Sequence, residues 1–471
     1  MKDFSSDAKT GSSIIDELAS ATQDLLRPSA DTQTGVVSAA GQRSIAKRSL
    51  VKGLTATVFA GGTFAAEPGH WDIDTAVLYY NETDRVQAIE PVVSATRQFD
   101  GERSLNTKLV VDVLTGASPN GAVASDFPQT YTRPSGKGNF TISNREIPLD
   151  DTFKDTRFAL SANWKQPLGE KTDGNIGLAF SNEYDYVSAS INGGFSYELD
   201  SSSTLSAGLS YAADSIDPVG GVPLEKSCMV GASANTSGGG IDCTVSFDAT
   251  RRGGDDSKDT LDLLLGYTRV VNQTTVAQFN LILSQSDGYH NDPYKVVSVV
   301  DSTSGEPLRH LYESRPDSRF KTGLFSRVKT WLFDRDVLDA SYRFQSDDWS
   351  MDSHTLDLRY RWQFASRQAL IPHLRYYTQS ETDFYKPFLR ADEAVPEYVS
   401  ADYRQGSFDG ITVGLEYAWQ PRNSESDVRV ALEYYQQSGD QPGNAPGQLA
   451  NKEIYPDLDA IMLRFNYDFD L

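Results

Sequence analysis

The chain has no run of eighteen apolar residues, so no segment is suited to cross a membrane as a helix. Only five histidines are present, which argues against a catalytic metal cage, and no CxxCH motif offers attachment for a c-type haem. Basic residues are outnumbered, 43 against 65, and the net charge of −22 argues against a general nucleic-acid binder, which needs a basic face. The sequence therefore predicts no cofactor, no metal and no nucleic-acid partner.

The lack of long apolar runs does not exclude a membrane protein. Strands of a transmembrane β-barrel expose only every second side chain to lipid, so their average hydropathy is unremarkable. The 23 tyrosines suit the interface between lipid and water, because the ring is apolar and the hydroxyl needs a polar partner. The acidic excess lies largely in segments predicted as loops, for example at Asp347 and Asp348, and is interpreted as a solvated surface.

Cysteine is nearly absent as well. The two cysteines, Cys228 and Cys243, lie in one long Gly/Ser-rich stretch, and an even count in an exported protein favours a disulfide between them. The enclosed loop is short, so this bond is expected to stiffen its own segment and not the whole fold.

The amino-terminal region has the pattern of an export signal. Basic residues at Lys47, Arg48 and Lys52 precede a short, mildly apolar run that ends in small residues at Ala65 and Ala66. This pattern predicts a secretory signal peptide over residues 47–66 and a mature domain over residues 67–471. Residues 1–46 lie upstream and are interpreted as a disordered extension or as a start codon assigned too early.

The mature region is dominated by alternation of apolar and polar residues with period two, which predicts strands with one apolar face. In one such segment Leu356, Leu358 and Tyr360 share a face, and Asp357 and Arg359 lie on the opposite one. About sixteen segments have this pattern and the length of a transmembrane strand. Their predicted spans are 70–82, 85–97, 103–114, 154–167, 174–184, 187–199, 203–213, 258–271, 274–286, 318–332, 336–346, 353–364, 368–380, 409–420, 427–437 and 458–471.

The connections between these segments alternate in length. Links such as 99–102, 200–202 and 272–273 are short, whereas 115–153, 214–257, 287–317, 381–408 and 438–457 are long. Outer-membrane barrels alternate in this way, with short turns towards the periplasm and long loops outside. The sequence therefore predicts an all-β fold: a single transmembrane antiparallel up-and-down β-barrel with both termini periplasmic, in the bacterial outer membrane.

The last segment supports this prediction. Ile461, Leu463 and Phe465 begin an apolar face that continues to Leu471, and the opposite face is polar. The segment resembles the carboxy-terminal signal by which the barrel-assembly machinery recognises outer-membrane proteins, although that signal usually ends in Phe or Trp. The expected partners are this machinery, outer-membrane lipid and a periplasmic protein.

The chain also resembles a specific family. The segments 67–80 (EPGHWDIDTAVLYY), 114–122 (LTGASPNGA) and 129–136 (QTYTRPSG) resemble motifs of an uncharacterised bacterial outer-membrane family, a "domain of unknown function" of the DUF3570 type. The resemblance covers nearly the whole mature chain and implies a β-barrel. It also implies an envelope redox context, since members are encoded near flavin-transferase and thioredoxin-like proteins, but it provides no catalytic residue.

The clearest chemical asymmetry is a basic strip predicted to face the barrel lumen, made of Lys321, Arg327, Lys329, Arg343, Arg359, Arg361 and Arg375. A strip of one charge sign on a narrow wall attracts ions of the opposite sign and indicates an anion path. The alternative is that these cations pair with lumenal carboxylates, for which the candidates are Glu183, Asp185, Glu416 and Glu433.

Three functions follow, in order of preference. The first is a porin-like channel for small polar or anionic solutes, and the second is a non-transporting scaffold for a periplasmic or surface partner. The third is a barrel hydrolase, but the spacing of His354, His373, Ser341 and Ser366 does not indicate a paired nucleophile and base. The loop residues His290 and Asp292 are weak candidates for metal ligands. The loop 115–153 is interpreted as a constriction, a docking surface or a lid over the barrel rim.

Overall fold

The computed structural model describes residues 69–133, 137–150, 154–229, 246–333, 335–422 and 426–471. The regions predicted as an upstream extension and a signal peptide lie outside this part of the chain. No helix among the described residues is long and apolar enough to cross a membrane.

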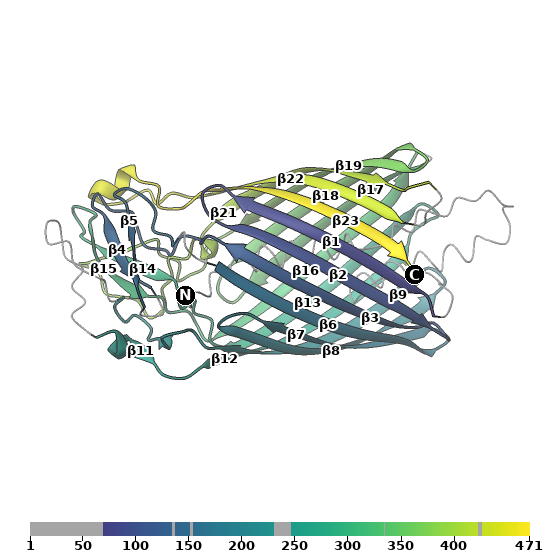
Figure 1. The fold of residues 1–471 in the computed structure, drawn as a ribbon, viewed down its shortest axis with the longest axis horizontal. Coiled ribbons are helices and arrows are strands. Elements are labelled where there is room, and N and C mark those ends of the chain that lie inside the picture. The colour runs from purple at the N-terminus through teal and green to yellow at the C-terminus, as the bar shows by residue number, and fades with distance from the viewer. Residues whose placement is uncertain (1–68, 134–136, 151–153, 230–245, 334, 423–425) are drawn as a thin grey trace.

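Sixteen antiparallel strands close into one barrel (Figure 1). They are β1 (Trp71–Glu82), β2 (Gln87–Phe99), β3 (Arg103–Thr115), β6 (Lys154–Gly169), β7 (Thr172–Asn182), β8 (Tyr186–Asp200), β9 (Ser203–Ile216), β12 (Asp256–Val270), β13 (Thr275–Gly288), β16 (Ser318–Leu332), β17 (Asp336–Asp347), β18 (Asp352–Ala365), β19 (Gln368–Gln379), β21 (Phe408–Trp419), β22 (Asp427–Gly439) and β23 (Leu458–Asp470). Each pairs with its neighbours in sequence order, and β23 pairs with β1 to complete the ring.

The predicted all-β fold, a closed antiparallel up-and-down barrel of about sixteen strands, is therefore confirmed strand for strand. The largest difference in a boundary is at β9, which was expected to end at residue 213 and ends at Ile216. Alternation succeeded here because a wall with lipid on one side and water on the other needs side chains of opposite character at successive positions.

The exterior of the barrel is apolar. Along β23, Ile461, Leu463 and Phe465 are each nearly half exposed, while the intervening Met462 and Arg464 are buried. Tyrosines near one edge of this band donate their hydroxyls to aspartates of the next strand, as Tyr211 does to Asp259 at 2.7 Å. Further pairs of this kind are Tyr376 with Asp409 and Tyr434 with Asp459. An exposed apolar band bordered by aromatic rings with satisfied hydroxyls is the surface that a barrel presents to lipid.

The two ends of the barrel differ (Figure 1). At one, here called the turn end, the strands are joined by short turns, and Trp71 pairs with Leu471. At the other, here called the cap end, the long connections fold into a second body. We call the described residues of 116–153, 217–255, 289–317, 380–407 and 440–457 the cap.

The cap has its own secondary structure. It contains β4 (Gln129–Thr132), β5 (Asn139–Ile142), β10 (Val222–Pro223), β11 (Arg251–Arg252), β14 (Val296–Val300), β15 (Pro307–Tyr312) and β20 (Leu389–Arg390), with the short 3₁₀ turns η1 (Phe247–Thr250), η2 (Tyr403–Gln405) and η3 (Gly447–Asn451). Strands β15, β14 and β20 form a three-stranded sheet around a small core of Val297, Val299, Leu311, Leu389, Val399 and Ala401. These elements were not predicted, although the run Val296–Val300 is rich in β-branched residues and every member is buried.

The loop 115–153 belongs to the cap. Its Tyr131 stacks on Phe140 and packs against His310 of β15. The backbone N–H of Asn120 donates to the Pro148 carbonyl within the loop, and the Asn120 carbonyl accepts from the Val296 N–H, which ties the loop to β14. Of the three interpretations of this loop, a structured lid over the rim describes its packing best.

Candidate functional site

The lumen is lined by the inward side chains of the barrel strands, and it contains the predicted basic strip. Its seven residues lie on the inner face of four consecutive strands, β16 to β19. Their outward neighbours, such as Leu324, Tyr342 and Trp362, are exposed apolar side chains on the lipid face. Register brings the strip together, because Lys329 lies opposite Asp339, which in turn lies opposite Arg359.

Part of the strip is neutralised within the same wall. Arg327 pairs with Asp339, with Nε 2.7 Å from Oδ1, and Arg359 lies 3.4 Å from Asp357. The remaining members differ. Among the described residues, Lys321, Lys329, Arg343 and Arg361 have no carboxylate within ion-pair distance. The Arg343 guanidinium lies 5.7 Å from the centre of the Phe325 ring, and Arg361 donates to Gln363 at 3.2 Å.

His373 forms a bridge at the edge of the strip. Its Nδ1 lies 2.8 Å from Glu433 Oε1, and its Nε2 lies 2.8 Å from Asp357 Oδ2. Only a protonated imidazole donates from both nitrogens, so this geometry holds His373 as a further cation. Gly414 of β21 lies between His373 of β19 and Glu433 of β22 in the register of the sheet. A Cβ at Gly414 would lie 2.6 Å from Glu433 Cγ. Glycine at this position lets the Glu433 side chain lie across the wall and reach the ring.

Three of the carboxylates proposed as partners of the strip contact other groups. Glu433 binds His373, Glu416 pairs with Arg464 at 3.1 Å, and Asp185 accepts a hydrogen bond from Tyr294. Sequence alternation placed these acids on the inner face, but the partner of each depends on the register between strands distant in sequence.

The rest of the lumen wall is different in character. Strands β7 to β9, β12 and β13 line it mostly with small and uncharged groups, such as Asn175, Asn192, Ser206 and Asn280. Glycine lets these side chains lie flat, since a Cβ at Gly177 would lie within 2.6 Å of the amides of Asn163 and Asn192. Acidic side chains gather instead on β22, β23 and β1 to β3. Cations also lie among these acids, where Arg429 pairs with Asp468 and Arg464 pairs with Glu416. The most basic part of the wall is the strip of seven residues on β16 to β19, here called the cationic arc.

The cap covers the mouth of the lumen at the cap end of the barrel. Gln379 of β19 donates to the carbonyls of Arg404 and Gly406 in the cap, and Gln437 of β22 donates to Tyr455. Inward side chains at this mouth are buried, among them Tyr80, Glu82, Leu114, Asp214 and Ile216.

A network of buried ion pairs holds the cap loops together. Arg315 lies 2.8 Å from Glu313 and 2.9 Å from Asp402, and Arg404 pairs with Asp402 at 2.5 Å and with Asp292 at 3.2 Å. Burial by itself would raise the pKa of the Asp402 carboxyl, but Arg404 and Arg315 outweigh burial and hold this pKa well below its usual range. These acids are structural and depart from the expectation of a solvated acidic surface in the loops, whereas Asp348 is exposed as expected. Asp347 departs from this expectation too, because it is buried against Arg319.

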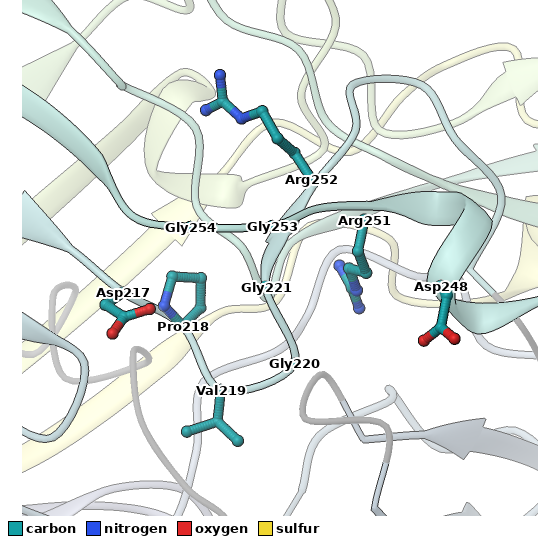
Figure 2. A pocket seen from close by; sticks show the side chains of 10 residues that line it. All are labelled: Asp217, Pro218, Val219, Gly220, Gly221, Asp248, Arg251, Arg252, Gly253 and Gly254. Carbon is teal, nitrogen blue, oxygen red and sulfur yellow. The ribbon is translucent and has the colours of Figure 1, made fainter.

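One pocket of about 440 Å³ opens beside η1 and β11 in the cap (Figure 2). It is lined by Asp217, Pro218, Val219, Gly220, Gly221, Asp248, Arg251, Arg252, Gly253 and Gly254. Both arginines are already engaged, since Arg251 donates to the Tyr312 hydroxyl at 2.5 Å and Arg252 pairs with Asp256. We assign no chemistry to this pocket.

The residues weighed for hydrolysis or metal binding are not brought together. His354 lies on the outer face against Tyr342, and within the described chain no hydrogen bond joins Ser341 or Ser366 to a histidine. His290 is held by Ser286 and by the Gly288 carbonyl, whereas Asp292 pairs with Arg404.

Another pair of serine and histidine, Ser298 and His310, is buried in the cap beyond the reach of a substrate. Cys228 is disulfide-bonded, and its backbone forms an isolated antiparallel β-bridge with Leu311 of β15. Its expected partner Cys243 lies outside the described residues, so the pairing stays a prediction.

The chain belongs to the family described as "Protein of unknown function (DUF3570)", whose model matches residues 45–469. This confirms the resemblance seen in the sequence motifs. No curated protein matches the chain.

Solved structures of outer-membrane barrels are similar in fold. The Pseudomonas aeruginosa protein OccK5 (OpdH) is 10% identical with a TM-score of 0.40, covering 87% of this chain and all (100%) of its own. A bacterial polysaccharide outer membrane secretin is 6% identical with a TM-score of 0.41, covering 86% of this chain and 100% of its own. The Pseudomonas aeruginosa ferric enterobactin receptor is 7% identical with a TM-score of 0.40, covering 80% of this chain and 54% of its own, so the chain spans about half the length of that receptor. These values say nothing of what this chain binds or transports.

Proposed function

We propose that this protein is an outer-membrane channel for small polar solutes that prefers anions. The cationic arc on β16 to β19 carries the proposal, and within it Lys329, Arg343 and Arg361 matter most, because no described carboxylate lies within ion-pair distance of them. Cations along a narrow, low-dielectric wall lower the energy of an anion in the lumen and raise that of a cation.

The apolar exterior supports a place in the membrane, and the apolar face of β23 suits recognition by the barrel-assembly machinery. In this arrangement the turn end and both termini face the periplasm, and the cap faces outside. Lipid contacts the exposed leucine, valine and aromatic side chains of every barrel strand.

The cap favours a second candidate function. A mouth covered by buried loops, with the backbone of Arg404 and Gly406 bound to Gln379, suits a non-transporting scaffold that presents the cap or the turn end to a partner protein. The two functions differ in whether ions cross the barrel. A channel conducts ions either with the cap in place or once the cap is loosened, whereas a scaffold conducts in neither state.

Conductance in planar lipid bilayers tests the first proposal. We expect the full chain, refolded and inserted, to give single-channel steps, and a KCl gradient to give a reversal potential of the sign set by chloride. Replacing Lys329, Arg343 and Arg361 together by Gln is expected to move that potential towards zero. The matched control replaces Arg335, Arg367 and Arg422 by Gln; these exposed residues of the short turns carry the same charge outside the lumen.

Two outcomes count against the channel. Equal shifts from the lumen triple and the turn triple would show that surface charge alone sets the preference. Absence of conductance both in the wild type and in a variant with a loosened cap, such as Arg315→Met, would leave the scaffold as the better function.

A further inference from the structure

The motif at the start of β1 belongs neither to the basic strip nor to the cap. In His70-Trp-Asp72-Ile-Asp74, alternate residues point to the same side, and Asp468-Phe-Asp470 at the other end of the chain repeats the pattern. Strand β1 pairs with β23 so that Asp72 lies opposite Asp470 and Asp74 lies opposite Asp468. Like charges directly opposite one another destabilise a strand pair, yet two such pairs stand in succession at the seam that closes the barrel.

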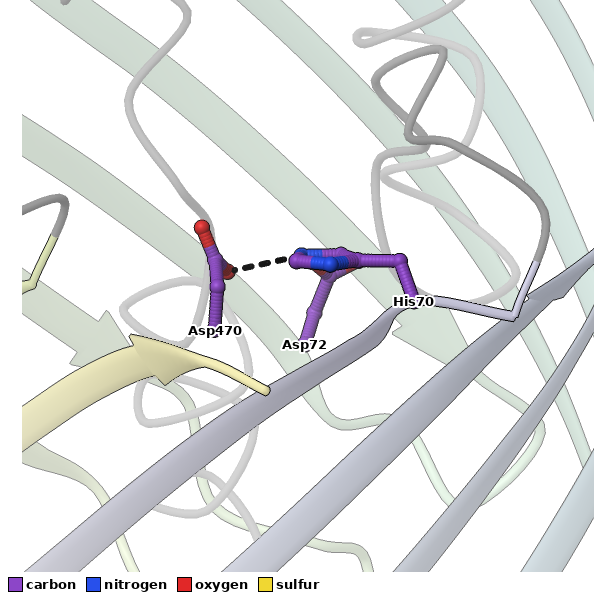
Figure 3. Close-up of side chains that lie close together, drawn as sticks. All are labelled: His70, Asp72 and Asp470. Atoms are coloured by element: carbon purple, nitrogen blue, oxygen red, sulfur yellow. Dashed lines mark ion pairs between the residues drawn. The ribbon is translucent and has the colours of Figure 1, made fainter.

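The first of these pairs is joined by a histidine (Figure 3). His70 Nε2 lies 3.3 Å from Asp72 Oδ1 and 3.5 Å from Asp470 Oδ1, and one ligand atom from each residue lies within 4.8 Å of the other two. Hydrogen bonds of this type are usually shorter, near 2.9 Å. Two atoms that each bind a tetrahedral zinc ion at about 2.0–2.1 Å are instead separated by about 3.3 Å.

The second pair, Asp74 and Asp468, continues this row of acids along the seam. Asp468 is 9% exposed, and its Oδ1 is buried and receives no hydrogen bond, while its Oδ2 pairs with Arg429 at 2.5 Å. The neighbour on its other side is the carboxyl group of Asp74, which is within hydrogen-bond reach of Asp468 and close to Asp72. Carboxylate oxygens in contact with one another need a cation or a shared proton between them.

We propose that His70, Asp72 and Asp470 bind a divalent transition metal at the turn end of the seam, with Asp74 and Asp468 as the adjoining acidic row. An imidazole together with carboxylates suits Zn²⁺ and similar ions, whereas Ca²⁺ and Mg²⁺ favour all-oxygen sets. The three ligand side chains are about a third exposed, so the ion has an entry path from solvent. Because the ligands come from the first and the last strand, the metal would clamp the barrel closed.

Calorimetric titration of the untagged, refolded full chain with Zn²⁺ tests the site. We expect one ion per chain in the wild type, and a loss of affinity of about 100-fold in His70→Ala, given that even outer-shell partners are worth 10–100-fold. Asp470→Asn removes a ligand without changing its shape and is expected to weaken binding similarly. The matched controls are His354→Ala, on the outer face, and Asp173→Asn, an inward carboxylate at the turn end that pairs with Lys165; both should bind as the wild type does.

A second measurement keeps the proposal testable if a variant folds poorly. Zn²⁺ is expected to raise the midpoint of heat unfolding of the wild type by a few degrees and to leave that of His70→Ala unchanged, because a ligand stabilises only the state that binds it. Equal Zn²⁺ affinity in the wild type, His70→Ala and Asp470→Asn would overturn the site, as would binding of Ca²⁺ as tight as that of Zn²⁺. Neither result depends on whether the barrel conducts ions.

Discussion

The barrel wall along β16 to β19 and the cap hold their charges differently. On β16 to β19 the ion pairs are local and stay partly open to the lumen: Arg359 and Asp357 lie two positions apart on β18, with 20% and 25% of their side chains exposed. In the cap, Arg315 and Asp402 are 9% and 0% exposed and come from segments far apart in sequence. The wall therefore keeps charge available to a solute, whereas the cap uses charge to fix loops to one another.

This difference has an energetic consequence. A partly exposed pair contributes little, about 0–1 kcal/mol, because water screens it and its desolvation is incomplete. Removing one partner of a buried pair leaves an uncompensated charge and costs about 3–5 kcal/mol. The cap is thus the region in which single charge changes should have large effects, while the same changes in the wall should alter selectivity more than stability.

The largest expected effect is at Arg315. Arg315→Met leaves the buried Glu313 without its cation and removes one of the two arginines that pair with Asp402, so it should destabilise the cap by about 3–5 kcal/mol. Hydrogen exchange measured by mass spectrometry should show lost protection over β14 and β15 with the barrel strands unchanged. Arg145→Met, which removes an exposed pair with Asp126, is the control and should change protection little. Loss of protection throughout the barrel would show that cap and wall are one cooperative unit.

The next effect tests the lipid face of the wall. Leu178 on β7 is 60% exposed on the outer face, and Leu178→Arg places a charge in the apolar band. In a membrane this should cost about 2–4 kcal/mol, whereas on a soluble surface it would be nearly neutral. Urea unfolding in lipid vesicles measures the cost, and Ser190→Arg, an inward position on β8, is the control. Equal stability of the two variants would contradict the assignment of the outer face to lipid.

The smallest effect concerns pH and is confined to the cap. Burial lowers the pKa of His310 to about 4, below its usual value of 6.5. The unfolded cap therefore binds a proton that the folded cap does not, so stability from this group is full above pH 6.5 and is lost as the pH falls towards 4, by up to about 3 kcal/mol. Protection of β14 and β15 against hydrogen exchange should fall over this range, and less steeply in His310→Phe. An unchanged pH dependence in that variant would assign the effect to other groups, among them His290, whose pKa burial also lowers to about 4.

Much of the barrel could be predicted from the sequence, because alternation is a local property. A residue such as Arg343 between Tyr342 and Phe344 reveals its face without knowledge of any partner. The sixteen strands, the inward placement of the basic strip and the positions of the short turns all follow from this pattern. The cap had no such pattern, since its strands are short, and its central strand β14 is buried on both faces and pairs with β20 across a long stretch of chain.

The sequence alone determined the wall: its strands, its apolar outer face and the sign of charge along β16 to β19. Only the tertiary structure decided which charges meet. Closure of the ring brings the motif at His70 and Asp72 against Asp470, almost four hundred positions away by their numbers. The register of β19, β21 and β22 across Gly414 brings His373 into contact with Glu433. Periodicity records the environment of each residue, which is local, while partners depend on strand register and chain closure, which no short segment contains.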